Sequence, residues 1–63
     1  MTFNVGDIIR TRGKSNGMYY FGVVLATDFY NDDIGCDAVK VQWFALNKTA
    51  YMPVTHIVKA EGN

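Results

Sequence analysis

The residues of this chain best suited to covalent chemistry are Cys36 and His56, each the only residue of its type. A catalytic dyad would have to pair His56 with Cys36 or with a serine. Enzymes activate such a nucleophile through an adjacent base, often in a strained turn or a recognisable motif. Neither residue lies in such a motif, so we interpret Cys36 as an ordinary thiol at a loop edge. We expect His56 to satisfy a backbone group or to cover one end of the core. The sequence predicts that the protein is not an enzyme.

Four aspartates, Asp28, Asp32, Asp33 and Asp37, are the residues most suited to holding a cation. A calcium loop of the EF-hand type requires oxygen donors at positions one, three and five, a glycine at six and a glutamate at twelve. No starting point in this stretch supplies them. We therefore interpret residues 31–37 as a solvated acidic loop.

Two other kinds of binding site are also missing from the sequence. One cysteine and one histidine fall short of the four ligands of a structural zinc site, and a single cysteine excludes an internal disulfide. Gly13 and Gly17 belong to a hairpin loop with no helix after it, so they do not form a phosphate cradle. We predict neither a metal ion nor a cofactor.

The 63 residues predict one domain, residues 1–63, with a formal net charge of zero. A protein that binds duplex nucleic acid is usually strongly basic, and this one is not. We find no signal peptide, and no apolar run approaches the roughly 18 residues of a membrane span. These features predict a cytoplasmic protein with a reduced thiol that does not enter a membrane.

The positions of apolar residues and of glycine, asparagine and aspartate predict an all-β protein. The expected strands are residues 7–12, 20–28, 38–44, 49–52 and 57–60, with a turn at Asn16-Gly17 and a single helical turn at 54–56. Pro53 ends the fourth strand because proline cannot donate to a central ladder.

The segment MYYFGVVLATDFY, residues 18–30, has three possible interpretations: a buried strand, a stub of membrane helix or a sticky surface. The β-branched and aromatic residues favour a strand, and Gly22 together with the absence of a polar stripe argues against a helix. A strand this long has to curl, and Gly22 is the cheapest place for a bend or a close backbone approach. Both of its faces are apolar. We expect its middle to build the core and its aromatic ends to emerge at the surface.

The chain has nine aromatic residues, more than a core of this size holds. We expect Val5 and Ile9 to point into the core, together with Phe21, Phe3 and one of the pair Trp43 and Phe44. The remaining rings lie at least partly on the surface: Tyr19, Tyr20, Phe29, Tyr30, Tyr51 and the outward member of that pair. The sequence leaves open whether they are scattered or form one patch.

The strand pattern resembles that of the SH3-like small β-barrels. The resemblance rests on five stretches that together span nearly the whole chain: VGDIIR at 5–10, GVVL at 22–25, VKVQWF at 39–44, YMP at 51–53 and HIV at 56–58. It is closest in character to small SH3-like proteins of tailed bacteriophages, including those of cyanobacteria. The resemblance implies a five-stranded antiparallel barrel with a short 3-10 turn before the last strand.

Opposite charges gather in two loops of the predicted barrel. Arg10, Arg12 and Lys14 lie at the end of the first strand and in the loop that follows, whereas the four aspartates lie between residues 28 and 37. The resemblance implies that these loops flank a groove, so that a basic and an acidic lip face each other across aromatic residues. Such an arrangement orients a partner more than it adds affinity.

These features predict a non-catalytic protein-interaction module. The expected binding residues are Arg10, Arg12, Tyr19, Tyr20, Phe29, Tyr30, Asp32, Asp33, Trp43, Phe44 and Tyr51. The partner is another protein or a second copy of the chain. The phage resemblance implies a virion component, or a protein that binds a factor in the cytoplasm of the host cell.

The alternative is a nucleic-acid-binding barrel. Its phosphate contacts would come from Arg10, Arg12, Lys14, Lys40 and Lys48, and Tyr20 or Trp43 would stack on bases. The neutral total charge and the acidic loop argue against this alternative.

Overall fold

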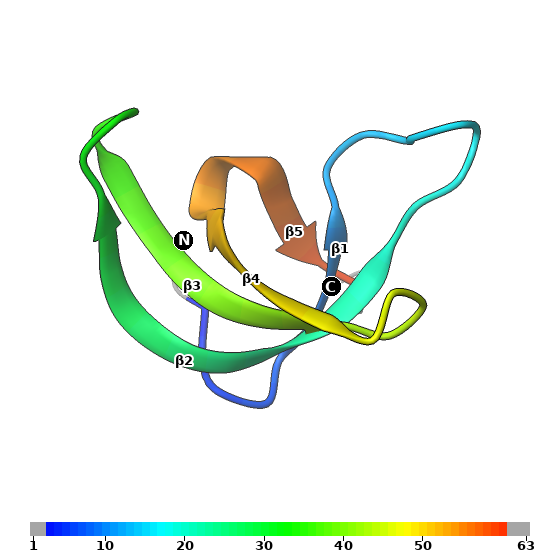
Figure 1. Ribbon diagram of the computed structural model, residues 1–63, viewed down its shortest axis with the longest axis horizontal. Helices are drawn as coiled ribbons and strands as arrows, with labels where there is room; N and C mark the ends of the chain where they lie inside the picture. Colours follow the sequence, from blue (N-terminus) through cyan, green and yellow to red (C-terminus); the bar gives the residue numbers. More distant parts are fainter. Residues whose placement is uncertain (1–2, 61–63) are drawn as a thin grey trace.

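Five antiparallel strands form a single sheet in the computed structural model of this protein, which describes residues 3–60 (Figure 1). The elements are β1 (Ile8–Thr11), β2 (Phe21–Asn31), β3 (Cys36–Trp43), β4 (Lys48–Pro53), the 3-10 turn η1 (Val54–His56) and β5 (Ile57–Lys59). Their order across the sheet is β4-β3-β2-β1-β5. The predicted five antiparallel strands, with a short helical turn before the last, are confirmed.

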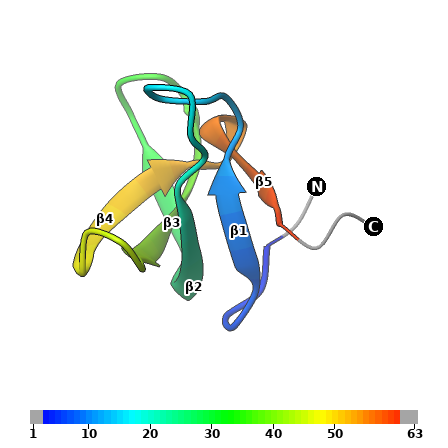
Figure 2. The same ribbon diagram turned by 90° about the vertical axis from the view of Figure 1, so that its right-hand side faces the viewer.

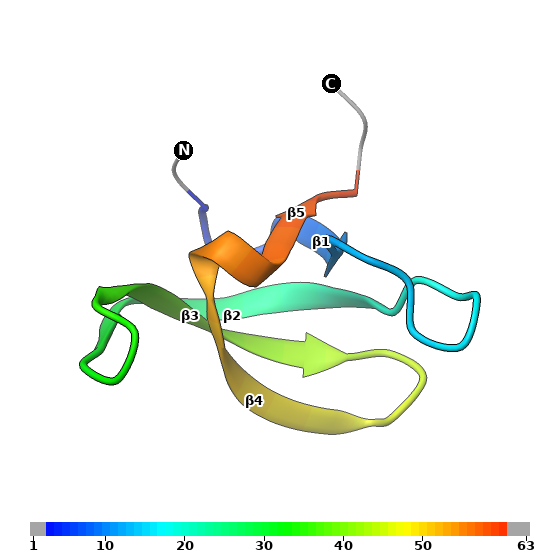
Figure 3. The same ribbon diagram turned by 90° about the horizontal axis from the view of Figure 1, so that it is seen from above.

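The sheet curls without closing into a barrel. β4 and β5 are its two edge strands and do not pair with each other (Figure 2). Pro53 ends β4 and leads directly into η1, which packs against β3 and turns the chain back toward β1 (Figure 3). The barrel implied by the resemblance is therefore present only as a curled, open sheet.

The longest strand, β2, curls because its pairing with β3 is interrupted twice. Register shifts lie between Val24 and Ala26 and between Ala26 and Phe29. Asp28, within the second shift, has a positive φ of 72°. A bulge of this kind leaves an extra residue on one strand, bends it and increases its twist. The prediction of a long curled strand is confirmed, and the bulges lie beyond Gly22 in the chain.

The core lies on one face of the sheet and is organised around a row of paired residues. Ile9 lies opposite Gly22, and Gly22 lies opposite Trp43. The core cluster consists of Phe3, Ile9, Val24, Val39, Val41, Trp43 and Ile57. The predicted core positions of Phe3 and Ile9 are confirmed. Of the adjacent aromatic pair, Trp43 is the buried member, with 7% of its surface exposed, and Phe44 is the outward one, with 54% exposed.

Two residues expected in the core lie outside it. Val5 is 65% exposed and Phe21 is 42% exposed. Phe21 pairs with Arg10, one position along from the Gly22 row, and successive side chains of a strand point to opposite faces. Phe21 therefore faces away from the core. Because both faces of β2 are apolar, hydrophobic alternation does not reveal which face is buried.

The loop between β1 and β2 is a tight hairpin at its tip, as predicted. Ser15 and Met18 exchange two backbone hydrogen bonds, of 2.8 and 3.0 Å. Between them, Asn16 and Gly17 have positive φ angles of 54° and 77°. Two-residue hairpins require such angles, and asparagine followed by glycine adopts them at low cost.

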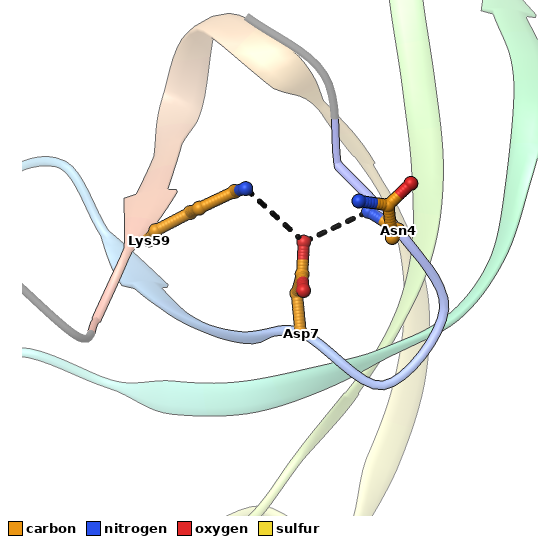
Figure 4. A network of polar contacts seen from close by, with 3 residues as sticks. All are labelled: Asn4, Asp7 and Lys59. Carbon is orange, nitrogen blue, oxygen red and sulfur yellow. Dashed lines mark hydrogen bonds and ion pairs between the residues drawn. The ribbon is translucent and has the colours of Figure 1, made fainter. Parts of the chain in front are cut away.

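A polar contact ties the start of the described chain to its last strand (Figure 4). The backbone N–H of Asn4 donates to Asp7 Oδ2 at 2.8 Å, and Lys59 Nζ lies 3.6 Å from the same oxygen. This is the only ion pair among residues 3–60. It holds the turn before β1 against β5, on the core side of the sheet edge.

Candidate interaction site

An aromatic wall stands at the end of the molecule where β2 turns into β3. Phe29 and Tyr30 belong to the last residues of β2, and Tyr51 belongs to β4. The rings of Phe29 and Tyr51 meet edge to face, with centroids 4.9 Å apart and planes at 74°. Lys40, on the intervening strand β3, places Nζ 6.0 Å from the centroid of the Tyr51 ring. An edge-to-face pair adds about 0.5–1.5 kcal/mol of stabilisation beyond that from its buried area. This interaction favours the observed orientation of the Phe29 and Tyr51 rings.

The loop that joins β2 to β3 is held by the side chain of Asn31. Its Oδ1 accepts hydrogen bonds from the backbone N–H groups of Asp33, at 2.9 Å, and Ile34, at 3.3 Å. Gly35, with a φ of 67°, donates its N–H to the Asn31 carbonyl at 2.8 Å. An asparagine that caps a turn in this way fixes the loop backbone. Asp32 and Asp33 are therefore presented on a defined turn.

Two pockets adjoin the aromatic wall. The first has a volume of about 330 Å³ and the second of about 400 Å³, and both are open to solvent. Phe29, Tyr30 and Ala38 line both pockets. Phe3 and Val54 complete the first beside the core, whereas Tyr51 closes the second. The two pockets are thus neighbours that share three lining residues at the end of β2.

The charged residues that line the two pockets are all acidic. Asp28 and Asp37 line the first pocket, and Asp32 and Asp33 line the second. All four are exposed, and none forms an ion pair with a described residue. Neither pocket is lined by a described lysine or arginine. We call the surface formed by Phe29, Tyr30, Tyr51 and these four aspartates the acidic aromatic groove.

The chemistry of the groove suits recognition of a cation that belongs to a larger ligand. The faces of tyrosine and phenylalanine rings attract ammonium and guanidinium groups, and carboxylates strengthen that attraction. A bare metal ion is a poorer match: among residues 3–60, no three histidine, cysteine, aspartate or glutamate side chains are arranged to hold one.

Two of the basic residues, Arg10 and Lys14, lie beside a different aromatic ring, that of Tyr19. The Arg10 guanidinium lies 4.2 Å from the centroid of the Tyr19 ring, and Lys14 Nζ lies 5.4 Å from it. Arg12 Nε donates to the Thr55 carbonyl at 2.8 Å. The loop that carries Lys14 and the acidic hairpin lie at opposite ends of the long axis, with η1 between them (Figures 1 and 3). The arrangement of two lips across one shared groove is not what the structure shows.

Besides Arg10, Arg12 and Tyr19, three more of the expected binding residues lie away from the groove. Trp43 is buried in the core, so its assignment to a binding surface is wrong. Tyr20 is half-buried and packs against the same core cluster. Phe44 is exposed, but its backbone N–H donates to the Phe21 carbonyl at the start of β2. The expected residues that the structure brings together are Phe29, Tyr30, Asp32, Asp33 and Tyr51.

Asp28, Asp37 and Ala38 also line the groove but were not among the expected binding residues. Asp28 is part of the acidic stretch in the sequence, yet its place in the pocket depends on the bulge in β2. Asp37 pairs with Tyr30, and Ala38 pairs with Phe29, across the β2–β3 ladder. Had the strand register been known, these pairings would have identified both residues.

Comparison of the chain with models of protein families, with curated proteins and with solved structures found no match. Within residues 3–60, no helix has the length and apolar character needed to cross a bilayer. The assignment of a role therefore rests on the fold and on the geometry of the acidic aromatic groove.

Proposed function

We propose that this protein is a non-catalytic interaction module whose acidic aromatic groove binds an extended, basic segment of another protein. The observation that supports this role most strongly is the make-up of the groove. Four aspartates and four aromatic side chains line two neighbouring pockets, and no described basic residue lines either of them. A lysine or arginine flanked by apolar residues complements both the charge and the rings.

The expected energetics follow from the exposure of the rings. Tyr30 and Tyr51 are 62% and 59% exposed, so a bound segment would bury much of their surface. Tyrosine is among the residues that most often anchor protein interfaces. The exposed aspartates contribute differently, because charges at an interface rim chiefly raise the association rate and orient the partner.

The resemblance to small phage proteins suggests which proteins carry the segment. In that setting the partner is a larger virion protein to which this module attaches, or a host factor that it modulates. Both roles use a binding surface and no catalytic chemistry.

Binding of the basic segment can be tested by fluorescence anisotropy with a panel of labelled ten-residue peptides. Each peptide carries arginine or lysine among apolar residues, and a matched peptide carries glutamate in place of each basic residue. We expect peptides of the basic set to bind, and the double variant Tyr30→Ala, Tyr51→Ala to lose affinity by about 30-fold, as for two interface anchors.

Phe44→Ala is the matched control, because it removes an exposed ring outside the groove. It should leave the affinity unchanged. Equal binding of the basic and glutamate peptides, or equal loss with Phe44→Ala and the double variant, would contradict the proposal.

A further inference from the structure

A second surface lies on the face of the sheet that points away from the core. Its rows follow from the strand register. In one row, Val23 lies between Ile8 on β1 and Gln42 on β3. In the next, Phe21 lies opposite Arg10. Because side chains alternate along a strand, these residues point to the face opposite Ile9 and Trp43.

A third row lies on the other side of the Val23 row. Lys40 pairs with Tyr51 on β4 and with Ala26 on β2. Leu25, beside the first bulge, is also exposed. We call the surface formed by Ile8, Arg10, Phe21, Val23, Leu25, Lys40, Gln42 and Tyr51 the outward sheet face.

The charge on the outward sheet face has one sign. The charged residues in its rows, Arg10 and Lys40, are both basic, and none of these rows contains a carboxylate. Tyr51, at the β4 edge of the face, is shared with the acidic aromatic groove. Each cation lies near a tyrosine ring: Arg10 is 4.2 Å from the Tyr19 centroid and Lys40 is 6.0 Å from that of Tyr51. Although the net charge is zero, the charges are unevenly distributed over the surface: four exposed aspartates lie at the acidic aromatic groove, and the charged residues in the rows of the outward sheet face are all basic.

The two cations indicate which kind of ligand can bind the outward sheet face. Packing against the same face of a second copy would bring cations toward cations without a compensating carboxylate. A polyanion with flat aromatic rings matches both features, because rings stack on exposed aromatic side chains and phosphates approach the cations.

We propose that the outward sheet face binds a short stretch of single-stranded nucleic acid. Bases stack on Phe21 and Tyr51, and phosphates contact Arg10 and Lys40. The β2 residues of the two outer rows, Phe21 and Ala26, are five positions apart with one bulge between them, which is about 13–16 Å at the usual rise per residue. A sheet surface of this extent holds two or three bases. The stacking residues proposed for this face, Phe21 and Tyr51, are not the Tyr20 and Trp43 expected from the sequence. Trp43 belongs to the core cluster, and Tyr20 packs against that cluster.

The test is fluorescence anisotropy with labelled ten-nucleotide oligothymidine and oligouridine at about 20 mM salt, and again as the salt is raised. We expect binding at low salt that weakens with a slope of about −1.4 in log–log form, as for two phosphate contacts on a single strand. Phe21→Ala and Arg10→Gln, each confirmed as folded by circular dichroism, should weaken binding on the order of tenfold. The DNA and RNA probes distinguish the two sources of the same chemistry.

Tyr30→Ala is the matched control, because it removes an exposed ring from the groove and leaves the outward sheet face intact. It should bind the oligonucleotides as the unmodified protein does. Three results would overturn the proposal: no binding at low salt, binding that neither Phe21→Ala nor Arg10→Gln weakens, or a dimer in light scattering that Phe21→Ala dissociates while no oligonucleotide binds. The last result would assign the face to a second copy of the chain.

Discussion

Replacing Trp43 with alanine should lower the free energy of unfolding by about 3–5 kcal/mol, the usual cost of removing a large buried ring. Trp43 is 7% exposed and belongs to the core cluster. A chain of 63 residues has a small core and a correspondingly small stability, so this loss is most of what is expected for the whole domain. Urea unfolding followed by far-ultraviolet circular dichroism measures it.

The adjacent Phe44 supplies the control for this prediction. Its ring is 54% exposed, so Phe44→Ala should change the free energy of unfolding by no more than about 0.5 kcal/mol. The two variants remove neighbouring aromatic rings and differ chiefly in burial. Equal destabilisation by the two substitutions would show that the assignment of the buried face of β3 is wrong.

Gly22→Ala is expected to be the second strongly destabilising change, by about 1–3 kcal/mol. A Cβ atom at this position would lie 2.5 Å from the Gln42 carbonyl oxygen and 2.8 Å from Val41 Cγ1. The oxygen belongs to the backbone of β3, the strand that pairs with β2, so it cannot move without disturbing the ladder. Thermal and urea unfolding of the variant measure the loss.

Gly13→Ala is the matched substitution for Gly22→Ala. A Cβ atom at Gly13 would meet nothing within 4 Å, and no positive φ opposes a side chain there. Replacement of such a glycine reduces the entropy of the unfolded chain, so the variant should be as stable as the original protein or slightly more stable. Gly22→Ala with unchanged stability would mean that β2 and β3 are not as close as the structure places them.

The strands could be predicted from the sequence because their signals are local. Alternation in residues 38–44 and the turn at Asn16-Gly17 depend on neighbouring residues alone. The face that β2 buries could not be predicted, because apolar residues occupy both of its faces. The structure shows that the face of β2 that carries Gly22 is the buried one, because β3 approaches β2 closely at this glycine, where there is no side chain. Phe21, the preceding residue, therefore points to the opposite, outward face.

The acidic aromatic groove could be predicted only in part. Its residues were recognised by type, but their grouping depends on register between strands distant in the sequence. Tyr51 meets Phe29 because β4 and β2 both pair with β3, and a shift of one position would separate their rings. The separation of the basic and acidic loops follows from the eleven-residue length of β2, two residues longer than expected.

The measurement that tests the role of the acidic aromatic groove most directly is a titration of the isotopically labelled protein with an arginine-containing peptide of the panel. Amide chemical shifts report binding residue by residue. We predict that the largest changes fall on residues 28–33 and on Tyr51, while the hairpin at 13–18 changes little. Largest changes at that hairpin or at Arg10, Phe21 and Val23 of the outward sheet face, or no change at millimolar peptide, would contradict the assignment of the groove as the binding site.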